Sequence, residues 1–293
     1  MSKYAFFLGC TIPYRLPFAE AALRQTLPEF GVELADLPFG CCPDPGGVQS
    51  FNAEAWHTLA ARNLCVAEEE NLDILAACTG CFETLKVTNA KLKADPDLRV
   101  KINENLKEVD REFKGTIEVK HFAQVFHNDI GSDAIAAKVT KPLKDFKFAT
   151  HSGCHYAKPA EYMQTDNPEN PTHLDNLIEA LGAESVPYLR KNICCGAGVR
   201  GVDQPVAYSV AREKIVEIER VGADALVTIC PTCFVSYDIG QVLMAKQFGK
   251  KTKIPVFIYP ELLGIAMGLD LSEGFKMHTI KVKSFLQKFN GEG

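Results

Sequence analysis

The chain has 293 residues, of which 46% are hydrophobic and 24% charged, and its formal net charge is −5. This length and composition fit one large globular domain or two of ordinary size. The acidic balance argues against nucleic-acid binding, and no run approaches the roughly 20 apolar residues of a membrane span, so we expect a cytoplasmic protein.

Short apolar runs alternate with segments of helical periodicity from the N-terminus onward. The pattern predicts strands at 4–9, 73–77, 145–150 and 224–229. It predicts helices at 17–27, 52–69, 82–94, 95–114, 171–182, 203–221, 234–247 and 278–289. Such alternation is typical of parallel sheets covered by helices, so the predicted fold class is α/β.

Ten of the eleven cysteines form two copies of one pattern, a single cysteine followed by an adjacent pair and then by CxxC. The first copy separates these units by 30 and 35 residues, and the second by 39 and 34 residues. The ten are Cys10, Cys41, Cys42, Cys78, Cys81, Cys154, Cys194, Cys195, Cys230 and Cys233. Because the flanking strands and glycines repeat too, we expect two pseudo-symmetric, Rossmann-like halves, 1–144 and 145–293, each with a small parallel sheet flanked by helices.

Four of the ten cysteines directly follow predicted strands: Cys10, Cys78, Cys154 and Cys230. In parallel sheets, ligands bind at the carboxyl ends of the strands, so we expect one edge of each half to gather five thiolates. A CxxC at the start of a helix also places its sulfurs where the helix dipole favours the anionic form.

Thiolates of this kind suit iron–sulfur clusters, zinc or copper(I). A structural zinc ion and a cubane cluster each take four ligands, whereas each half offers five. The fifth thiolate favours a cluster of unusual shape or one with a bridging thiolate, and the spacing does not decide between them. A zinc-stabilised scaffold without enzymatic activity remains an alternative.

The double motif resembles the duplicated CCG domain and, among CCG proteins, the B subunits of methanogen heterodisulfide reductases. The CCG letters occur in full at Cys194, Cys195 and Gly196, whereas the first copy reads CCP at 41–43. Gly46 and Gly47 follow closely and retain the backbone freedom of a turn.

The resemblance implies that each half binds a non-cubane 4Fe–4S cluster through its five cysteines. The two clusters would face each other and deliver one electron each, so that the mixed disulfide of coenzyme M and coenzyme B is reduced to two thiols. The implied partners are an iron–sulfur C subunit and a flavin-containing A subunit of an electron-bifurcating complex, with a hydrogenase or formate dehydrogenase upstream. The alternative that CCG proteins suggest is an electron-transfer subunit of a lactate or glycolate oxidase, a fumarate reductase or a quinone-linked system.

The substrate that the resemblance implies carries a sulfonate, a carboxylate and a phosphate, so cations are expected near the clusters. The candidates are Arg15, Lys158 and Arg200, with Arg190 and Lys191 close to the second adjacent pair. A proton donor to the departing thiolate is also needed, and the candidate is His155, ahead of the weaker candidates His151, Tyr14 and Tyr156. We expect purely structural roles for the remaining side chains of note: Trp56, Cys65, His121 and His127.

Overall fold

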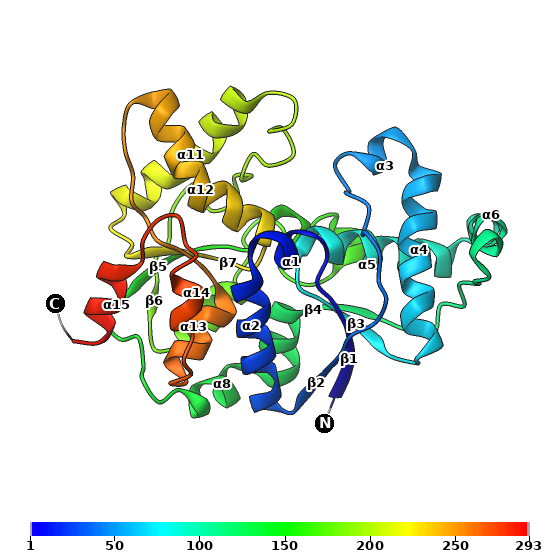
Figure 1. The fold of residues 1–293 in the computed structure, drawn as a ribbon, viewed down its shortest axis with the longest axis horizontal. Helices are drawn as coiled ribbons and strands as arrows, with labels where there is room; N and C mark the ends of the chain where they lie inside the picture. The colour runs from blue at the N-terminus through cyan, green and yellow to red at the C-terminus, as the bar shows by residue number, and fades with distance from the viewer. Residues whose placement is uncertain (1, 292–293) are drawn as a thin grey trace.

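A computed structural model describes residues 2–291 of the chain. The described residues form two four-stranded parallel sheets with the strand orders β2-β1-β3-β4 and β6-β5-β7-β8 (Figure 1). The strands are β1 Ser2–Phe7, β2 Val32–Ala35, β3 Asp73–Ala76, β4 Val119–His121, β5 Lys147–His151, β6 Glu184–Ser185, β7 Ala225–Thr228 and β8 Val256–Ile258. The same order in both sheets confirms the predicted α/β fold with two similar halves.

Helices cover the faces of both sheets. Those of the first half are α1 Thr11–Arg15, α2 Pro17–Thr26, η1 Leu27–Phe30, α3 Val48–Phe51, α4 Ala53–Glu69, α5 Thr79–Ala94, α6 Pro96–Leu106, η2 Lys107–Val109, α7 Phe122–Gln124, the π-helix η3 Val125–Ile130 and α8 Ser132–Lys138. Those of the second half are η4 Cys154–Tyr156, α9 Ala160–Met163, α10 His173–Glu179, α11 Gln204–Arg220, α12 Pro231–Phe248, α13 Tyr259–Ala266, α14 Ser272–Phe275 and α15 Lys283–Phe289.

The helices α4 and α11 occupy equivalent places in the two halves. Each has 17 residues and follows an N-cap side chain, Asn52 or Asp203, which accepts a hydrogen bond from a backbone N–H of the first turn. When the two helices are aligned on their N-cap residues, residue 63 of α4 occupies the position of residue 214 of α11. In Figure 1 the two helices belong to separate lobes that rise on either side of α1 and α5.

The two halves share one continuous apolar core. Helix α2 of the first half packs against α13 and α14 of the second. Aromatic rings cross the same boundary, with Phe18 and Phe234 centred 5.4 Å apart and Phe126 and Tyr259 centred 5.7 Å apart. The expected division at residues 144 and 145 falls between α8 and β5, and it stays a prediction.

Three predicted helices are shorter than their periodicity indicated: the predicted 171–182 helix is His173–Glu179, and two others are cut short by buried acidic side chains. The 95–114 helix is interrupted after η2, because the buried carboxylate of Glu68 accepts hydrogen bonds from the backbone N–H groups of Lys114 and Thr116 and draws that segment into a loop. The 278–289 helix begins only at Lys283, since Asp238 accepts from the two preceding backbone N–H groups of residues 279 and 280. In both cases a buried acidic side chain outweighs the local helical pattern.

Candidate cysteine-rich site between the two halves

Each CxxC stands where a strand gives way to a helix. Cys78 is the N-cap residue of α5 and Cys230 is that of α12, and both have extended backbone angles. Cys81 and Cys233 follow in the first turn of these helices. The sequence therefore places two thiols of each half at a helix N-terminus, where a thiolate is stabilised.

Eight of the ten thiols form one continuous series that runs from the first half into the second. Cys81 Sγ lies 3.0 Å from Cys42 Sγ, and Cys81 and Cys230 are both near enough to Cys78 to shift the pKa of its thiol. The order along the series is Cys42, Cys81, Cys78, Cys230, Cys233, Cys195, Cys194 and Cys154. The five-cysteine groups predicted for the two halves therefore adjoin each other at Cys78 and Cys230. Cys10 and Cys41 lie at the exposed side of the first group.

The pKa values of neighbouring thiols diverge along the series. Interactions with adjacent cysteines lower the pKa of Cys42, Cys194 and Cys230. Adjacent cysteines and burial raise the pKa of Cys81 and Cys233 well above the ordinary value. Such divergence is expected where several thiols crowd together in a buried place.

A glycine leaves space beside the sulfurs in each half. Gly9 has φ +70°, and a Cβ atom there would stand 2.7 Å from Cys81 Sγ. Gly153, at the same position of the repeat, has φ +82°, and its Cβ would stand 3.2 Å from Thr79 Oγ1. Both the backbone angle and the space therefore require glycine before the first cysteine of each series.

Buried polar atoms without a protein partner surround the sulfurs of the second half. They include Ser152 Oγ and the hydroxyl of Tyr237, and the pKa of this tyrosine is raised by burial and by the adjacent Cys195 and Cys233. Such donors fit a bound group with several acceptor atoms, as the sulfides and thiolates of a cluster are. Among residues 2–291, no group of three or more His, Cys, Asp or Glu side chains is arranged to hold a single metal ion.

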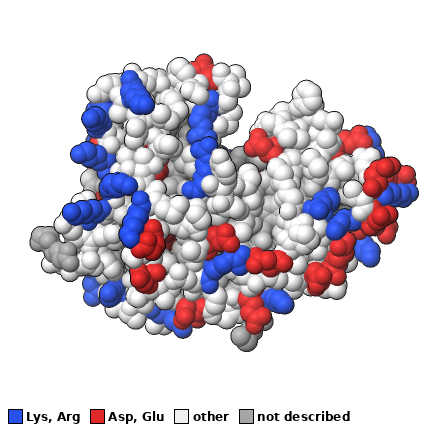
Figure 2. Space-filling view, viewed as in Figure 1, with Lys and Arg blue, Asp and Glu red and all other residues white. Residues whose placement is uncertain are grey.

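A cleft of about 380 Å³ opens where the two halves meet. Five cysteines of the second series line it, together with Asp44, Pro45, Gly46, Thr79 and Gly80 of the first half. Figure 2 shows the surface hollowed between the lobe of α11 and α12 and the lobe of α3 and α4, with a column of Lys and Arg side chains on the α12 side. A molecule in this cleft would touch thiols and both halves at once.

His155 lines the cleft and pairs with a carboxylate of the opposite half. Its Nδ1 lies 3.0 Å from Oε2 of Glu83, which α5 holds in a buried position. Burial acts to lower the pKa of His155, but the hydrogen bond and charge of Glu83 outweigh it and raise this pKa. The proton-donor role stays a prediction, and Glu83 is a partner that sequence reasoning missed.

The structure does not bring the three candidate cations together. Arg15 is exposed at the end of α1, with its guanidinium 5.7 Å from the ring centre of Tyr14. Lys158 lines a small cavity of about 40 Å³ behind Cys154 and lies 3.5 Å from Glu169. Arg200 is half-buried beside Gly201, which does line the cleft. Their substrate-binding roles stay predictions.

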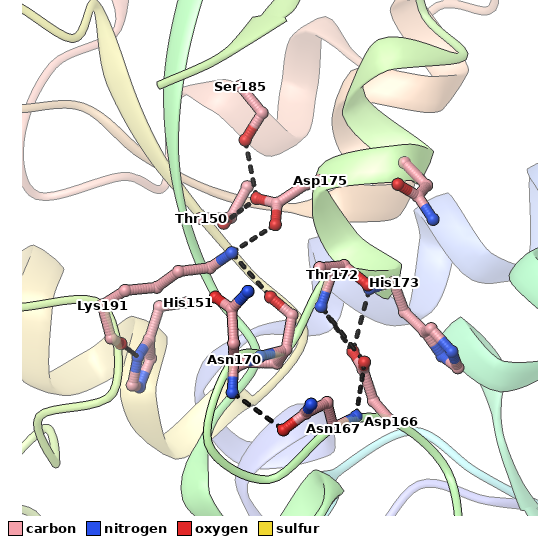
Figure 3. Close-up of polar contacts among 12 residues, drawn as sticks. Thr150, His151, Asp166, Asn167, Asn170, Thr172, His173, Asp175, Ser185 and Lys191 are labelled. Carbon is pink, nitrogen blue, oxygen red and sulfur yellow. Dashed lines mark hydrogen bonds and ion pairs between the residues drawn. The ribbon is translucent and has the colours of Figure 1, made fainter. Parts of the chain in front are cut away.

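Lys191 serves the framework behind the second adjacent pair (Figure 3). Its ammonium group contacts the Asp175 carboxylate and donates to the carbonyl of Pro171 at 2.6 Å. The same carboxylate accepts from Thr150 at 2.6 Å and from Ser185 at 2.7 Å. Lys191 thereby ties the 187–193 segment to β5 and β6.

Tyr156, a weaker proton-donor candidate, and the histidines for which structural roles were expected make framework contacts. Tyr156 is buried and shares a hydrogen bond of 3.1 Å with His173 Nδ1, whose ring stacks on that of His127 at 3.7 Å. His121 Nδ1 accepts from the backbone of Ala123 and caps α7. Cys65 contacts none of the ten, and burial raises its pKa to about 12.

Sequence reasoning also missed Lys214, which is fully buried on α11 behind the second series. Burial lowers its pKa to about 7, while the charges of Cys233 and its neighbours act in the opposite direction. The available signal was a lysine on the apolar stripe of the 203–221 helix, beside Ala207, Ala211, Ile215 and Ile218.

The fold and site define a duplicated α/β protein that gathers thiols at the carboxyl ends of its parallel strands, between its two halves. The family model described as a cysteine-rich domain, CCG, matches residues 4–86 and again 148–238. The chain is 38% identical over 292 residues to the B subunit of the ferredoxin/F(420)H(2)-dependent CoB-CoM heterodisulfide reductase of Methanosarcina acetivorans, covering 98% of this chain and 97% of that protein. The chain therefore belongs to the CCG cysteine-rich domain family, together with the heterodisulfide reductase B subunits, which confirms the predicted resemblance.

More distant relatives carry other names. The chain is 29% identical to the 8-methylmenaquinol:fumarate reductase membrane anchor subunit of Wolinella succinogenes, over 95% of this chain and 96% of that protein. A crystal structure of a hypothetical protein from Helicobacter pylori superimposes with a TM-score of 0.76 at 16% identity, covering 96% of this chain and 52% of that one. This last likeness concerns the fold alone. No helix among residues 2–291 is long and apolar enough to cross a membrane.

Proposed function

We propose that this chain is the catalytic subunit that reduces the mixed disulfide of coenzyme M and coenzyme B to two thiols. The observation that carries the proposal is the cleft lined by thiols at the meeting point of two repeated cysteine series. Cleavage of a disulfide takes two electrons and two protons, and two repeated cysteine series that meet beside this cleft suit a reaction of this stoichiometry. The relatives named as heterodisulfide reductase B subunits support the same assignment.

The ten cysteines are the proposed ligands, five for each of two 4Fe–4S clusters of non-cubane type. Cys10, Cys41, Cys42, Cys78 and Cys81 would hold the first, and Cys154, Cys194, Cys195, Cys230 and Cys233 the second. When bound, the clusters would supply the two electrons. The proximity of Cys78 and Cys230, each of which shifts the pKa of the other, supports a short distance between the two centres.

His155 is the proposed proton donor. Its ring lines the cleft beside Cys154, and the buried carboxylate of Glu83 holds Nδ1, so that Nε2 is free to serve the substrate side. Glu83 would orient the ring and stabilise its protonated form. Arg15, Lys158 and Arg200 remain proposed contacts for the anionic groups of the substrate.

The proposed partners are an iron–sulfur C subunit and a flavin-containing A subunit of an electron-bifurcating complex. A hydrogenase or formate dehydrogenase would stand upstream. The chain has neither a P-loop nor a ferredoxin-type cysteine run, and the G-x-G-x-x-G letters at 196–201 belong to the turn after the second adjacent pair. Electrons would therefore arrive from another protein.

A second candidate is electron transfer within a fumarate reductase or another quinone-linked system, or in lactate or glycolate oxidation. The observation that favours it is the relative named as a fumarate reductase anchor subunit, which matches nearly the whole chain. In that role the exposed edge near Cys10 and Cys41 would face an electron-transfer partner.

The test is an anaerobic assay of iron-loaded protein with an artificial electron donor and the mixed disulfide of coenzymes M and B. We expect stoichiometric release of both thiols, with far slower reduction of the two symmetrical disulfides. Iron and sulfide analysis of the same sample separates the alternatives. Zinc without iron would exclude the cluster proposal. A fully iron-loaded sample that reduces no disulfide but transfers electrons from lactate or to quinone would favour the second candidate.

A further inference from the structure

A chain of hydrogen bonds links α11 to a sulfur of the second series. Lys214 Nζ lies 3.0 Å from His151 Nδ1, and His151 Nε2 lies 3.3 Å from Cys233 Sγ. Lys214 also donates to the carbonyl of Lys191 at 2.5 Å. Both the lysine and the histidine are buried, with exposed fractions of 0% and 2%.

Two groups face Nδ1 of His151: Lys214 Nζ at 3.0 Å and the carbonyl oxygen of Lys191 at 3.5 Å. An ammonium group has donors and no acceptor, so with Lys214 protonated Nδ1 accepts from it and carries no proton. The proton of the neutral imidazole then lies on Nε2, which points at Cys233 Sγ. His151 therefore donates an N–H···S hydrogen bond to this sulfur, and the cation behind it strengthens the bond.

Aromatic rings enclose the cation from the other side. Lys214 Nζ lies 5.5 Å from the ring centre of Tyr188 and 6.0 Å from that of Tyr237. The ring of Tyr237 also meets that of His151 edge-on at 5.3 Å. These faces favour a positive charge at Nζ and hold the lysine and histidine in line.

The first half lacks this device although it repeats the same architecture. Phe7 stands at the repeat position of His151, two residues before the glycine of its half, and it has no hydrogen-bond donor. Asn63 stands on α4 at the position of Lys214 on α11. It is neutral and contacts backbone groups, accepting from Gly40 N and donating to the carbonyl of Cys41.

We propose that Lys214 and His151 are positioning residues that make the metal centre of the second half easier to reduce than that of the first. The inference rests on the proposed function, since it presumes a cluster on each cysteine series. A hydrogen bond to a ligand sulfur and a nearby positive charge both stabilise the more negative, reduced state of a centre. The second centre then accepts an electron before the first, and the two otherwise similar sites are reduced in a fixed order.

The test exchanges each residue for one that lacks its donor. His151→Phe copies the first half, and Lys214→Met removes the charge at similar side-chain length. His151→Gln, which retains an N–H donor, and Cys65→Ala, outside both series, are the controls. Redox titrations followed by electron paramagnetic resonance on the iron-loaded chain should resolve two reduction steps in the parent. In His151→Phe and in Lys214→Met, the reduction potential of the second centre should fall while that of the first stays unchanged. The difference between the two potentials should therefore become smaller.

Three results can be told apart. Absence of iron and sulfide from the parent chain would remove the proposed function itself. Full iron loading of His151→Phe and Lys214→Met with unchanged potentials would overturn this inference and leave the proposed function standing. If a variant fails to load iron, the inference is tested on the parent chain instead, by measuring the nitrogen-15 chemical shifts of the His151 ring. Protonation on Nδ1 rather than Nε2 would equally overturn the inference.

Discussion

Cys78 of the first half and Cys230 of the second are neighbours that shift each other's pKa, and each is the N-cap residue of a helix. They are therefore the point at which the two cysteine series become one. The other cysteines differ in their distance from this point along the series, with Cys42 near one end and Cys154 at the other. Because the cysteines differ in their distance from this junction, replacing one should affect a single centre or both, depending on its place in the series.

Removal of a cysteine far from that junction should abolish one centre only. We expect the parent to contain about eight irons, four per cluster, and Cys42→Ala or Cys195→Ala to retain roughly half. Cys78→Ala should disturb both centres, because its sulfur contacts the opposite series. Cys65→Ala is the control and should keep the full iron content. Iron analysis with spectroscopy decides the matter, and survival of both centres in Cys42→Ala and Cys195→Ala would show the ligand assignment to be wrong.

The pair of His155 and Glu83 should matter for turnover without mattering for iron binding. A positioned general acid contributes about 100-fold or more to a rate, so we expect His155→Phe to lose about that factor. Glu83→Gln should lose less, because Nδ1 keeps a hydrogen-bonding neighbour but not its charge. The readout is the rate of thiol release per iron-loaded chain. Equal rates in parent and His155→Phe would exclude the proton-donor role.

Asn63 should be needed for the first centre and not for the second. Its side chain accepts from Gly40 N at 2.8 Å and donates to the carbonyl of Cys41 at 2.9 Å, which fixes the loop bearing the first adjacent pair. Asn63→Ala removes both of these hydrogen bonds, each of which contributes about 0.5–1.5 kcal/mol to stability. We expect reduced occupancy of the first centre with the second unchanged. Loss of both centres together would indicate global destabilisation, for which the thermal midpoint is the check.

The repeat was readable in the sequence because it rests on local features. Strand, glycine, cysteine and helix cap recur within short stretches, and the structure has the CxxC cysteines at the starts of α5 and α12 as these features indicate. The contact of Cys78 with Cys230 was not readable, since it depends on how two similar sheets pack. Neither was Glu83, a residue of one half whose partner His155 belongs to the other.

The differences between the halves were harder to see than their likeness. Lys214 sits within an ordinary amphipathic pattern, and only the matched caps of α4 and α11 set it against Asn63. The strands β2 and β6 have four and two residues, which is too short for a periodicity to emerge. Buried acidic side chains such as Glu68 act through backbone groups distant in sequence, which no local pattern records.

A buried ion pair near the C-terminus should give the protein's stability a dependence on pH. His278 Nε2 lies 2.8 Å from Oε1 of Glu261, and the two side chains are 0% and 2% exposed. Burial acts to lower the pKa of His278, but the charge and hydrogen bond of Glu261 outweigh it and raise this pKa above 6.5. The protonated ring is thus favoured in the folded chain.

The sign of the pH effect follows from that direction. A group whose pKa is higher in the folded than in the unfolded state contributes its full stabilisation below the unfolded value, about 6.5. That contribution is lost as the pH rises through the raised folded pKa. We expect the thermal midpoint of the parent to fall over this range relative to His278→Asn, which cannot titrate. Glu261→Ala, which leaves a buried partner unpaired, should cost about 3–5 kcal/mol, whereas Glu273→Gln in the exposed pair with Lys276 should change the midpoint little. Parallel pH profiles for the parent and His278→Asn would mean that the pair stays neutral in the folded chain.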